Sequence, residues 1–210
     1  MKNNITELVF VMDKSGSMAG LEKDVIGGFN SMLEKQKKQE GTVYVTTVLF
    51  SHEKAVLHDR LPIDRVAPMT DGDYVPSGTT ALLDALGSTI RHIADIHRYA
   101  RPEDVPEHTI FVITTDGMEN ASRRCTAEHV REMIRKEEQK YGWEFLFLAA
   151  NIDAVETAEH IGIRPEHAAN YAPTAAGATR LYECVDRAVT NVRASRGITR
   201  EWSSGLRDKD

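Results

Sequence analysis

Three oxygen-bearing side chains stand at every second position near the start of the chain. Asp13, Ser15 and Ser17 lie in the sequence Asp-Lys-Ser-Gly-Ser-Met, directly after the apolar run 8–12. Gly16 lets the backbone turn between them, because glycine adopts angles that other residues avoid. One carboxylate and two neutral hydroxyls are hard oxygen ligands, which suit Mg²⁺, Mn²⁺ or Ca²⁺ better than zinc. The sequence therefore indicates half of a divalent-cation site.

A second acid and a threonine occur later in the chain in similar surroundings. Asp116 comes directly after the apolar run 109–115, and Thr79 follows a glycine just before an amphipathic helical pattern. Because the carboxyl ends of parallel strands meet at one edge of a sheet, we expect these residues to lie beside Asp13. The five oxygen ligands would carry only two formal negative charges. A divalent cation held in this way stays electrophilic and can accept a carboxylate from outside.

The elements that must position these side chains alternate between strand and helix. Apolar runs rich in β-branched and aromatic residues predict strands at 8–12, 42–50, 55–61, 109–115 and 143–150, with a short one at 168–172. Amphipathic patterns predict helices at 18–38, 82–93, 126–141, 153–162 and 174–192. Two glycines in the middle of the first helix, Gly27 and Gly28, indicate that this helix approaches the sheet closely.

This order of elements predicts an α/β fold. Only a short turn separates the strands 42–50 and 55–61, so these two form an antiparallel hairpin. Helices separate the other strands, as in parallel sheets. We therefore expect a Rossmann-like, doubly wound and mostly parallel sheet with one antiparallel edge strand and helices on both faces.

The composition is that of an ordinary globular protein, with 210 residues of which 41% are hydrophobic and 28% are charged. One domain is expected over residues 1–194, followed by a tail at 195–210 that Trp202 could pin to the body. The net charge of −6 argues against nucleic acid as a partner and requires any attraction for an anion to be local.

The sequence also predicts where the protein is found. No apolar run approaches the ~20 residues needed to cross a bilayer, so we expect no membrane association. The N-terminus shows no signal peptide, and the two cysteines, Cys125 and Cys184, are far apart and in no metal-binding spacing. Reduced thiols in the cytoplasm are therefore expected.

The site motifs resemble the metal-ion-dependent adhesion site (MIDAS) of von Willebrand factor A (VWA) domains. That site is built on Asp-x-Ser-x-Ser, a threonine in a Gly-Thr loop and an aspartate in a Thr-Asp-Gly turn. In this chain, Asp-Lys-Ser-Gly-Ser, Ser-Gly-Thr-Thr and Thr-Thr-Asp-Gly follow in the same order at 13–17, 77–80 and 114–117. The resemblance covers roughly residues 5–192, as judged from the order of elements.

The resemblance implies that Ser15, Ser17 and Thr79 bind the metal directly, while Asp13 and Asp116 act directly or through water. It implies Mg²⁺ or Mn²⁺ in preference to Ca²⁺, and a module that is not an enzyme but captures a Glu or Asp carboxylate of a protein partner. The chain is similar to the free-standing intracellular VWA proteins of bacteria, some of which act beside ATPases or in stress-response complexes.

Four further residues near the motifs are weaker candidates. Thr80 is the alternative occupant of the threonine position, and Lys14 lies inside the first motif. Glu119 and Asn120 follow Asp116 closely, where they would stand behind the ligands or at the rim of the site, unless they only cap a turn.

Two other functions fit the same residues. An aspartate after a strand also occurs in phosphohydrolases that use it as a nucleophile with Mg²⁺, which makes Asp13 a candidate catalytic residue. Such enzymes place a second acid two residues on, where this chain has Ser15. A metal-independent scaffold protein is the third possibility, and its partner binding would be insensitive to a chelator.

Overall fold

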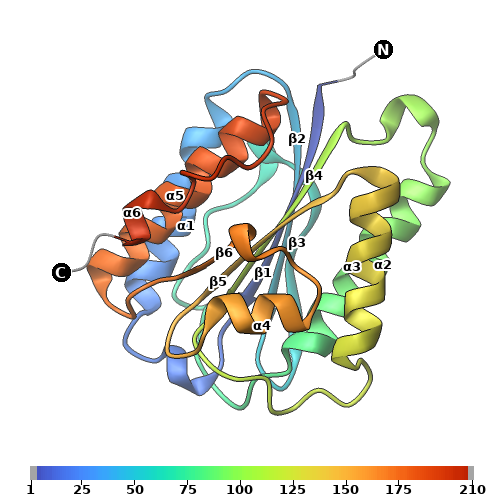
Figure 1. The fold of residues 1–210 in the computed structure, drawn as a ribbon. Helices are drawn as coiled ribbons and strands as arrows, with labels where there is room; N and C mark the ends of the chain where they lie inside the picture. The colour runs from blue at the N-terminus through green and yellow to red at the C-terminus, as the bar shows by residue number, and fades with distance from the viewer. Residues whose placement is uncertain (1–3, 208–210) are drawn as a thin grey trace.

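The computed structural model describes residues 4–207 and shows a six-stranded sheet between two layers of helices (Figure 1). The strands are β1 (Ile5–Asp13), β2 (Thr42–Phe50), β3 (Lys54–Pro62), β4 (His108–Thr115), β5 (Glu144–Ala149) and β6 (Ala168–Asn170). Their order in the sheet is β3-β2-β1-β4-β5-β6. Every neighbouring pair is parallel except β2 with the edge strand β3. This confirms the predicted fold class.

The helices cover both faces of the sheet. One face carries α1 (Glu22–Lys37), α5 (Ala175–Arg193) and α6 (Ser204–Arg207), and the other carries α2 (Leu82–Tyr99), α3 (Ala127–Tyr141) and α4 (Ala154–His160) (Figure 1). Alternate residues of β1 point to opposite faces. Phe10 and Met12 therefore enter the core under α1 and α5, while Val9 and Val11 enter the core under α2 and α3. Within the described residues, no helix is both apolar enough and long enough to cross a membrane.

Gly28 explains how α1 packs. A Cβ atom at this position would stand 2.3 Å from the ring of Tyr182, which belongs to α5. A Cβ atom at Gly27 would meet nothing within 4 Å. The prediction that the glycines bring α1 close to the sheet was therefore wrong, because the close approach is between α1 and α5.

The C-terminal segment packs against the body of the domain. Trp202 is buried, and its indole N–H donates to the carbonyl oxygen of Glu166 at 2.8 Å. The partly buried side chains of Ile198 and Leu206 join the same core. The predicted tail is thus attached through Trp202 at least to residue 207, while its last three residues, like the first three of the chain, lie outside the described residues.

His167, next to this attachment, predicts a loss of stability in acid. Burial, followed by the positive charge of Arg164, lowers the pKa of His167 from 6.5 to about 4. Between these values the unfolded chain binds a proton that the folded protein does not bind. The stabilisation is therefore complete above about pH 6.5 and is lost as the pH falls toward 4.

Lowering the pH from about 7 to about 5 should reduce the free energy of unfolding by up to about 2 kcal/mol through His167. The net loss of the whole protein should be smaller than this contribution. Burial raises the pKa of Glu138 and of Glu144, so protonation of these two groups stabilises the folded protein as the pH falls. Urea denaturation of the wild type and of His167→Gln at both pH values measures the effect. A variant that lost as much stability as the wild type would contradict it.

Candidate metal centre

The candidate site lies where the order of the strands reverses. Strand β1 stands between β2 and β4, and the register pairs Met12 with Thr114. The loops that follow β1 and β4 therefore leave the same edge of the sheet side by side. This is the place where doubly wound sheets bind their ligands.

Asp13 is the most rigidly held of the candidate residues. Its side chain is fully buried, Oδ1 accepts from the backbone N–H of Ser15 at 2.7 Å, and Oδ2 accepts from the hydroxyl of Thr115 at 2.7 Å. The hydroxyl of Tyr74 donates to its backbone carbonyl oxygen. Each carboxylate oxygen keeps a further lone pair for a metal or a water molecule.

Three hydroxyl groups lie around the same space. The Oγ atoms of Ser15 and Ser17 are 3.1 Å apart, in and just before the short 3₁₀ helix Gly16–Met18. Ser17 Oγ and Thr80 Oγ1 lie 3.6 and 3.7 Å from the point where a Cβ atom at Gly117 would stand. Both hydroxyls therefore lie close to Gly117, on the same side of the candidate site.

Asp116 brings a negative charge that the protein does not fully satisfy. Only 3% of the residue is exposed, and its Oδ1 is buried without a hydrogen-bond partner. Burial and then the charge of Asp13 raise the pKa of Asp116, against the opposing hydrogen bonds from Ser17 and Asn151. A buried carboxylate oxygen of this kind needs an explanation, and the binding of a cation supplies one.

The residues present fit a hard divalent cation. Among residues 4–207, no group of three or more His, Cys, Asp or Glu side chains could hold a metal, so a site here must use hydroxyl ligands. Two carboxylates and three hydroxyls are all oxygen donors, as Mg²⁺ and Mn²⁺ prefer.

The structure separates the two neighbouring threonines. Thr79 is exposed and lines a groove, whereas Thr80 is 4% exposed and its hydroxyl, like that of Ser17, lies close to Gly117. Asn120 fixes Thr80, because its Oδ1 accepts from the Thr80 N–H at 3.0 Å and its own N–H donates to the Thr80 carbonyl at 3.1 Å. Because of this burial and these hydrogen bonds, we take Thr80 rather than Thr79 as the candidate ligand.

Solved structures resemble this fold over most of the chain. A von Willebrand factor type A protein from Catenulispora acidiphila matches with a TM-score of 0.61 and 13% identity, over 87% of this chain and 42% of that one. Proximal thread matrix protein 1 from the mussel byssus, with a zinc-occupied MIDAS motif, matches at 0.58 and 16%, over 87% and 45%. Manganese-loaded TRAP protein of Plasmodium vivax matches at 0.55 and 18%, over 85% and 73%.

The chain has a VWA-type fold. It spans less than half of the mussel and Catenulispora chains. No protein-family model and no curated protein matches its sequence.

In this VWA-type fold, Glu119 and Lys14 have hydrogen-bonding roles beside the candidate ligands. Both carboxylate oxygens of Glu119 accept hydrogen bonds, from the N–H of Leu83 at 2.8 Å and from the N–H and hydroxyl of Ser122 at 2.7 and 2.8 Å. Glu119 therefore satisfies a free N–H in the first turn of α2, just after the Thr80 loop. Lys14 is half-buried, and its backbone N–H donates to the carbonyl of Phe50 at 2.7 Å.

Sequence reasoning missed three residues of the site. Thr115 and Tyr74 hold Asp13, and Asn151 interacts with Asp116. Asn151 follows β5 with a φ of 58°, a left-handed conformation that asparagine tolerates better than most residues. An asparagine directly after a third apolar strand was the signal that could have revealed it.

Proposed function

We propose that this VWA-type domain is a metal-dependent protein-interaction module and not an enzyme. Mg²⁺ or Mn²⁺ would be held by the ligands Asp13, Ser15, Ser17, Thr80 and Asp116. Two carboxylates leave the ion electrophilic, so it would capture a Glu or Asp side chain of a protein partner. The observation that carries this proposal is the buried, unpartnered Oδ1 of Asp116 beside three neutral hydroxyls.

The comparisons support a divalent metal at this position. Two of the similar structures contain zinc in a MIDAS motif or manganese. In this chain, the same edge of the sheet holds an all-oxygen set of ligands. Mg²⁺ is our choice because such hard ligands suit it.

The surroundings of Asp13 argue against the phosphohydrolase alternative. A nucleophilic carboxylate must reach a substrate, whereas Asp13 is fully buried with both oxygens hydrogen-bonded. The neighbouring surface suits a protein instead. Met118, two residues after Asp116, is 72% exposed, and Val75, next to Tyr74, is 55% exposed. Methionine is among the residues that are enriched in protein interfaces.

We further propose that the protein acts in the cytoplasm and that its partner is an acidic protein, such as one in an ATPase or stress-response complex. Cys125 and Cys184 are buried free thiols, as in proteins of a reducing compartment.

Thr80→Val should weaken Mg²⁺ binding at least about tenfold, whereas Thr79→Val should leave it unchanged. Valine keeps the shape of threonine and removes only the hydroxyl, and Thr80, unlike the exposed Thr79, is buried with its hydroxyl close to Gly117. Isothermal titration of Mg²⁺ into the wild type and both variants measures this. Equal affinities for all three proteins would contradict Thr80 as a ligand, and a wild type that binds no Mg²⁺ would contradict the metal centre.

The capture of a carboxylate needs its own experiment. A labelled peptide with a single glutamate should bind in Mg²⁺, and should bind neither in EDTA nor when glutamine replaces the glutamate. Fluorescence anisotropy gives the affinities. Binding that persists in EDTA would favour the metal-independent scaffold, and release of phosphate from a phosphoester in Mg²⁺ would favour the phosphohydrolase.

A further inference from the structure

An open groove of about 960 Å³ begins at the loop that carries Thr79 and Thr80. It runs between the β2–β3 turn, the first half of α2 and the segment 120–124. Asn120, which fixes Thr80, lines the groove at the end nearest to the metal centre. A partner segment that leaves the metal in this direction would therefore lie in the groove.

The groove is basic although the protein as a whole is acidic. Four exposed cations line it, namely Lys54, Arg91, Arg123 and Arg124. The lining also contains two acids, Glu53 and Asp84. The net charge of the chain is −6, so this is a local reversal of the field.

Asp84 does not neutralise the cations, because the backbone already uses its carboxylate. Its oxygens accept from the N–H groups of Arg123, Arg124 and Cys125 at 2.9, 2.8 and 2.7 Å. Burial alone would raise the pKa of Asp84, but these three hydrogen bonds lower it. Asp84 therefore fixes the backbone of the segment 123–125, which forms one wall of the groove. The side chains of Arg123 and Arg124 remain exposed to solvent.

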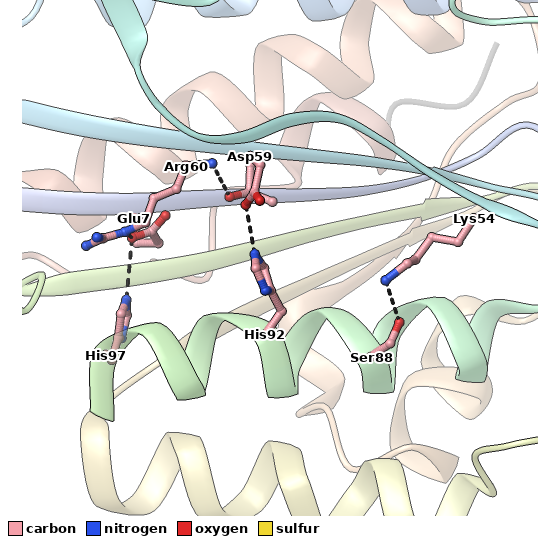
Figure 2. Close-up of polar contacts among 8 residues, drawn as sticks. Glu7, Lys54, Asp59, Arg60, Ser88, His92 and His97 are labelled. Atoms are coloured by element: carbon pink, nitrogen blue, oxygen red, sulfur yellow. Dashed lines mark hydrogen bonds and ion pairs between the residues drawn. The ribbon is translucent and has the colours of Figure 1, made fainter. Parts of the chain in front are cut away.

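Lys54 and Arg91 both line the groove, close enough for their positive charges to interact. Lys54 Nζ donates to the hydroxyl of Ser88 at 3.0 Å (Figure 2). The pKa of Lys54 is lowered by burial and then by the positive charge of Arg91, and the negative charge of Asp59 opposes this only in part. The nearest acid on the same strand, Asp59, is engaged with His92 at 2.8 Å (Figure 2). In the part of the chain that the structure describes, neither Lys54 nor Arg91 forms an ion pair.

We propose that this groove binds an acidic peptide segment that continues from the carboxylate on the metal. The inference rests on the proposed function, since the metal holds the first acidic side chain, and it adds that further acidic side chains lie against Lys54 and Arg91. An anion between two cations that repel each other removes the repulsion and gains two attractions. The partner would then be chosen by a run of acids rather than by a single one.

The test compares two labelled peptides in Mg²⁺, one with a single glutamate and one in which glutamates alternate with serines. The second peptide should bind about tenfold more tightly, with an affinity that falls as salt is added. The double variant Lys54→Glu/Arg91→Glu should remove this advantage and leave the single-glutamate peptide and the Mg²⁺ titration unchanged. All substituted side chains are exposed, so the fold should be kept.

Lys23→Glu/Arg135→Glu is the matched control, because both residues are exposed and lie on α1 and α3, away from the groove, with the same change of net charge. The proposal is overturned if the control weakens the multi-glutamate peptide as much as the groove variant does. It is also overturned if the two peptides bind the wild type equally, or if a single-stranded oligonucleotide displaces the multi-glutamate peptide more effectively than unlabelled peptide. Failure of the metal centre is a different result, in which EDTA changes neither peptide's binding.

Discussion

Asp116→Asn should abolish Mg²⁺ binding and at the same time stabilise the metal-free protein. The Oδ1 atom of Asp116 is buried without a partner, and the charge of Asp13 opposes its ionisation. Removing the charge should raise the free energy of unfolding without metal by about 1 kcal/mol, the lower end of the cost of an unsatisfied buried group. Mg²⁺ affinity should fall by more than about a hundredfold, since even groups behind metal ligands contribute about 10–100-fold.

Asp13→Asn is the matched control with the opposite effect on stability. Both oxygens of Asp13 accept hydrogen bonds, from Ser15 and Thr115, and the amide NH₂ of asparagine cannot replace one of these acceptors. This variant should also lose Mg²⁺ binding, but it should lower the free energy of unfolding by about 1–3 kcal/mol.

Urea denaturation in EDTA and in Mg²⁺ measures both quantities for the wild type and the two variants. Mg²⁺ should stabilise only the wild type, because a ligand stabilises the state that binds it. If Asp116→Asn were less stable than the wild type in EDTA, the buried charge of Asp116 would not cost the metal-free protein stability. If Mg²⁺ still stabilised Asp116→Asn, this residue would not be a ligand.

The fold could be predicted from the sequence because its strands are continuous apolar runs. The central strands are buried on both faces, so their patterns stand out, and the hairpin was visible in the short turn before β3. Asp13, Ser15 and Ser17 were found because they are adjacent in sequence and follow such a strand directly.

The choice between Thr79 and Thr80 could not be made from sequence, because it depends on contacts from distant segments. Gly78 turns the loop with a φ of +73° and leaves no room for a side chain against His52. Asn120 then holds Thr80 in place across the site. Periodicity carries no information on such loop contacts, and the same limit hid the roles of residues 74, 115 and 151.

A second large effect is expected at the opposite end of β1, at a residue that the apolar pattern concealed. The side chain of Glu7 has no exposed surface, and its Oε2 lies 2.8 Å from Nε of Arg60 and 3.4 Å from Nε2 of His97 (Figure 2). Arg60 reaches Glu7 from the edge strand β3 with a φ of 48°, in the left-handed region. Strand β3 is therefore strained at Arg60, the residue that places a positive charge beside the buried Glu7.

Arg60→Met should reduce the free energy of unfolding by about 3–5 kcal/mol, because it leaves the Glu7 charge buried without its main partner. The neighbouring ion pair between Asp59 and His92 is exposed and serves as the internal comparison (Figure 2). Asp59→Asn should cost less than about 1 kcal/mol, since exposed ion pairs contribute little. Chemical denaturation of both variants at neutral pH measures the difference.

The double variant Glu7→Leu/Arg60→Met separates the lost ion pair from lost packing. Replacing both partners removes the uncompensated charge, so this variant should recover most of the stability that Arg60→Met loses. Arg60 also stands over the ring of Tyr44 at 4.7 Å, a contact that methionine keeps only in part. If the double variant were as unstable as Arg60→Met, the loss would come from packing on Tyr44. Recovery would instead show that Arg60 is retained at a strained position because Glu7 is buried in β1.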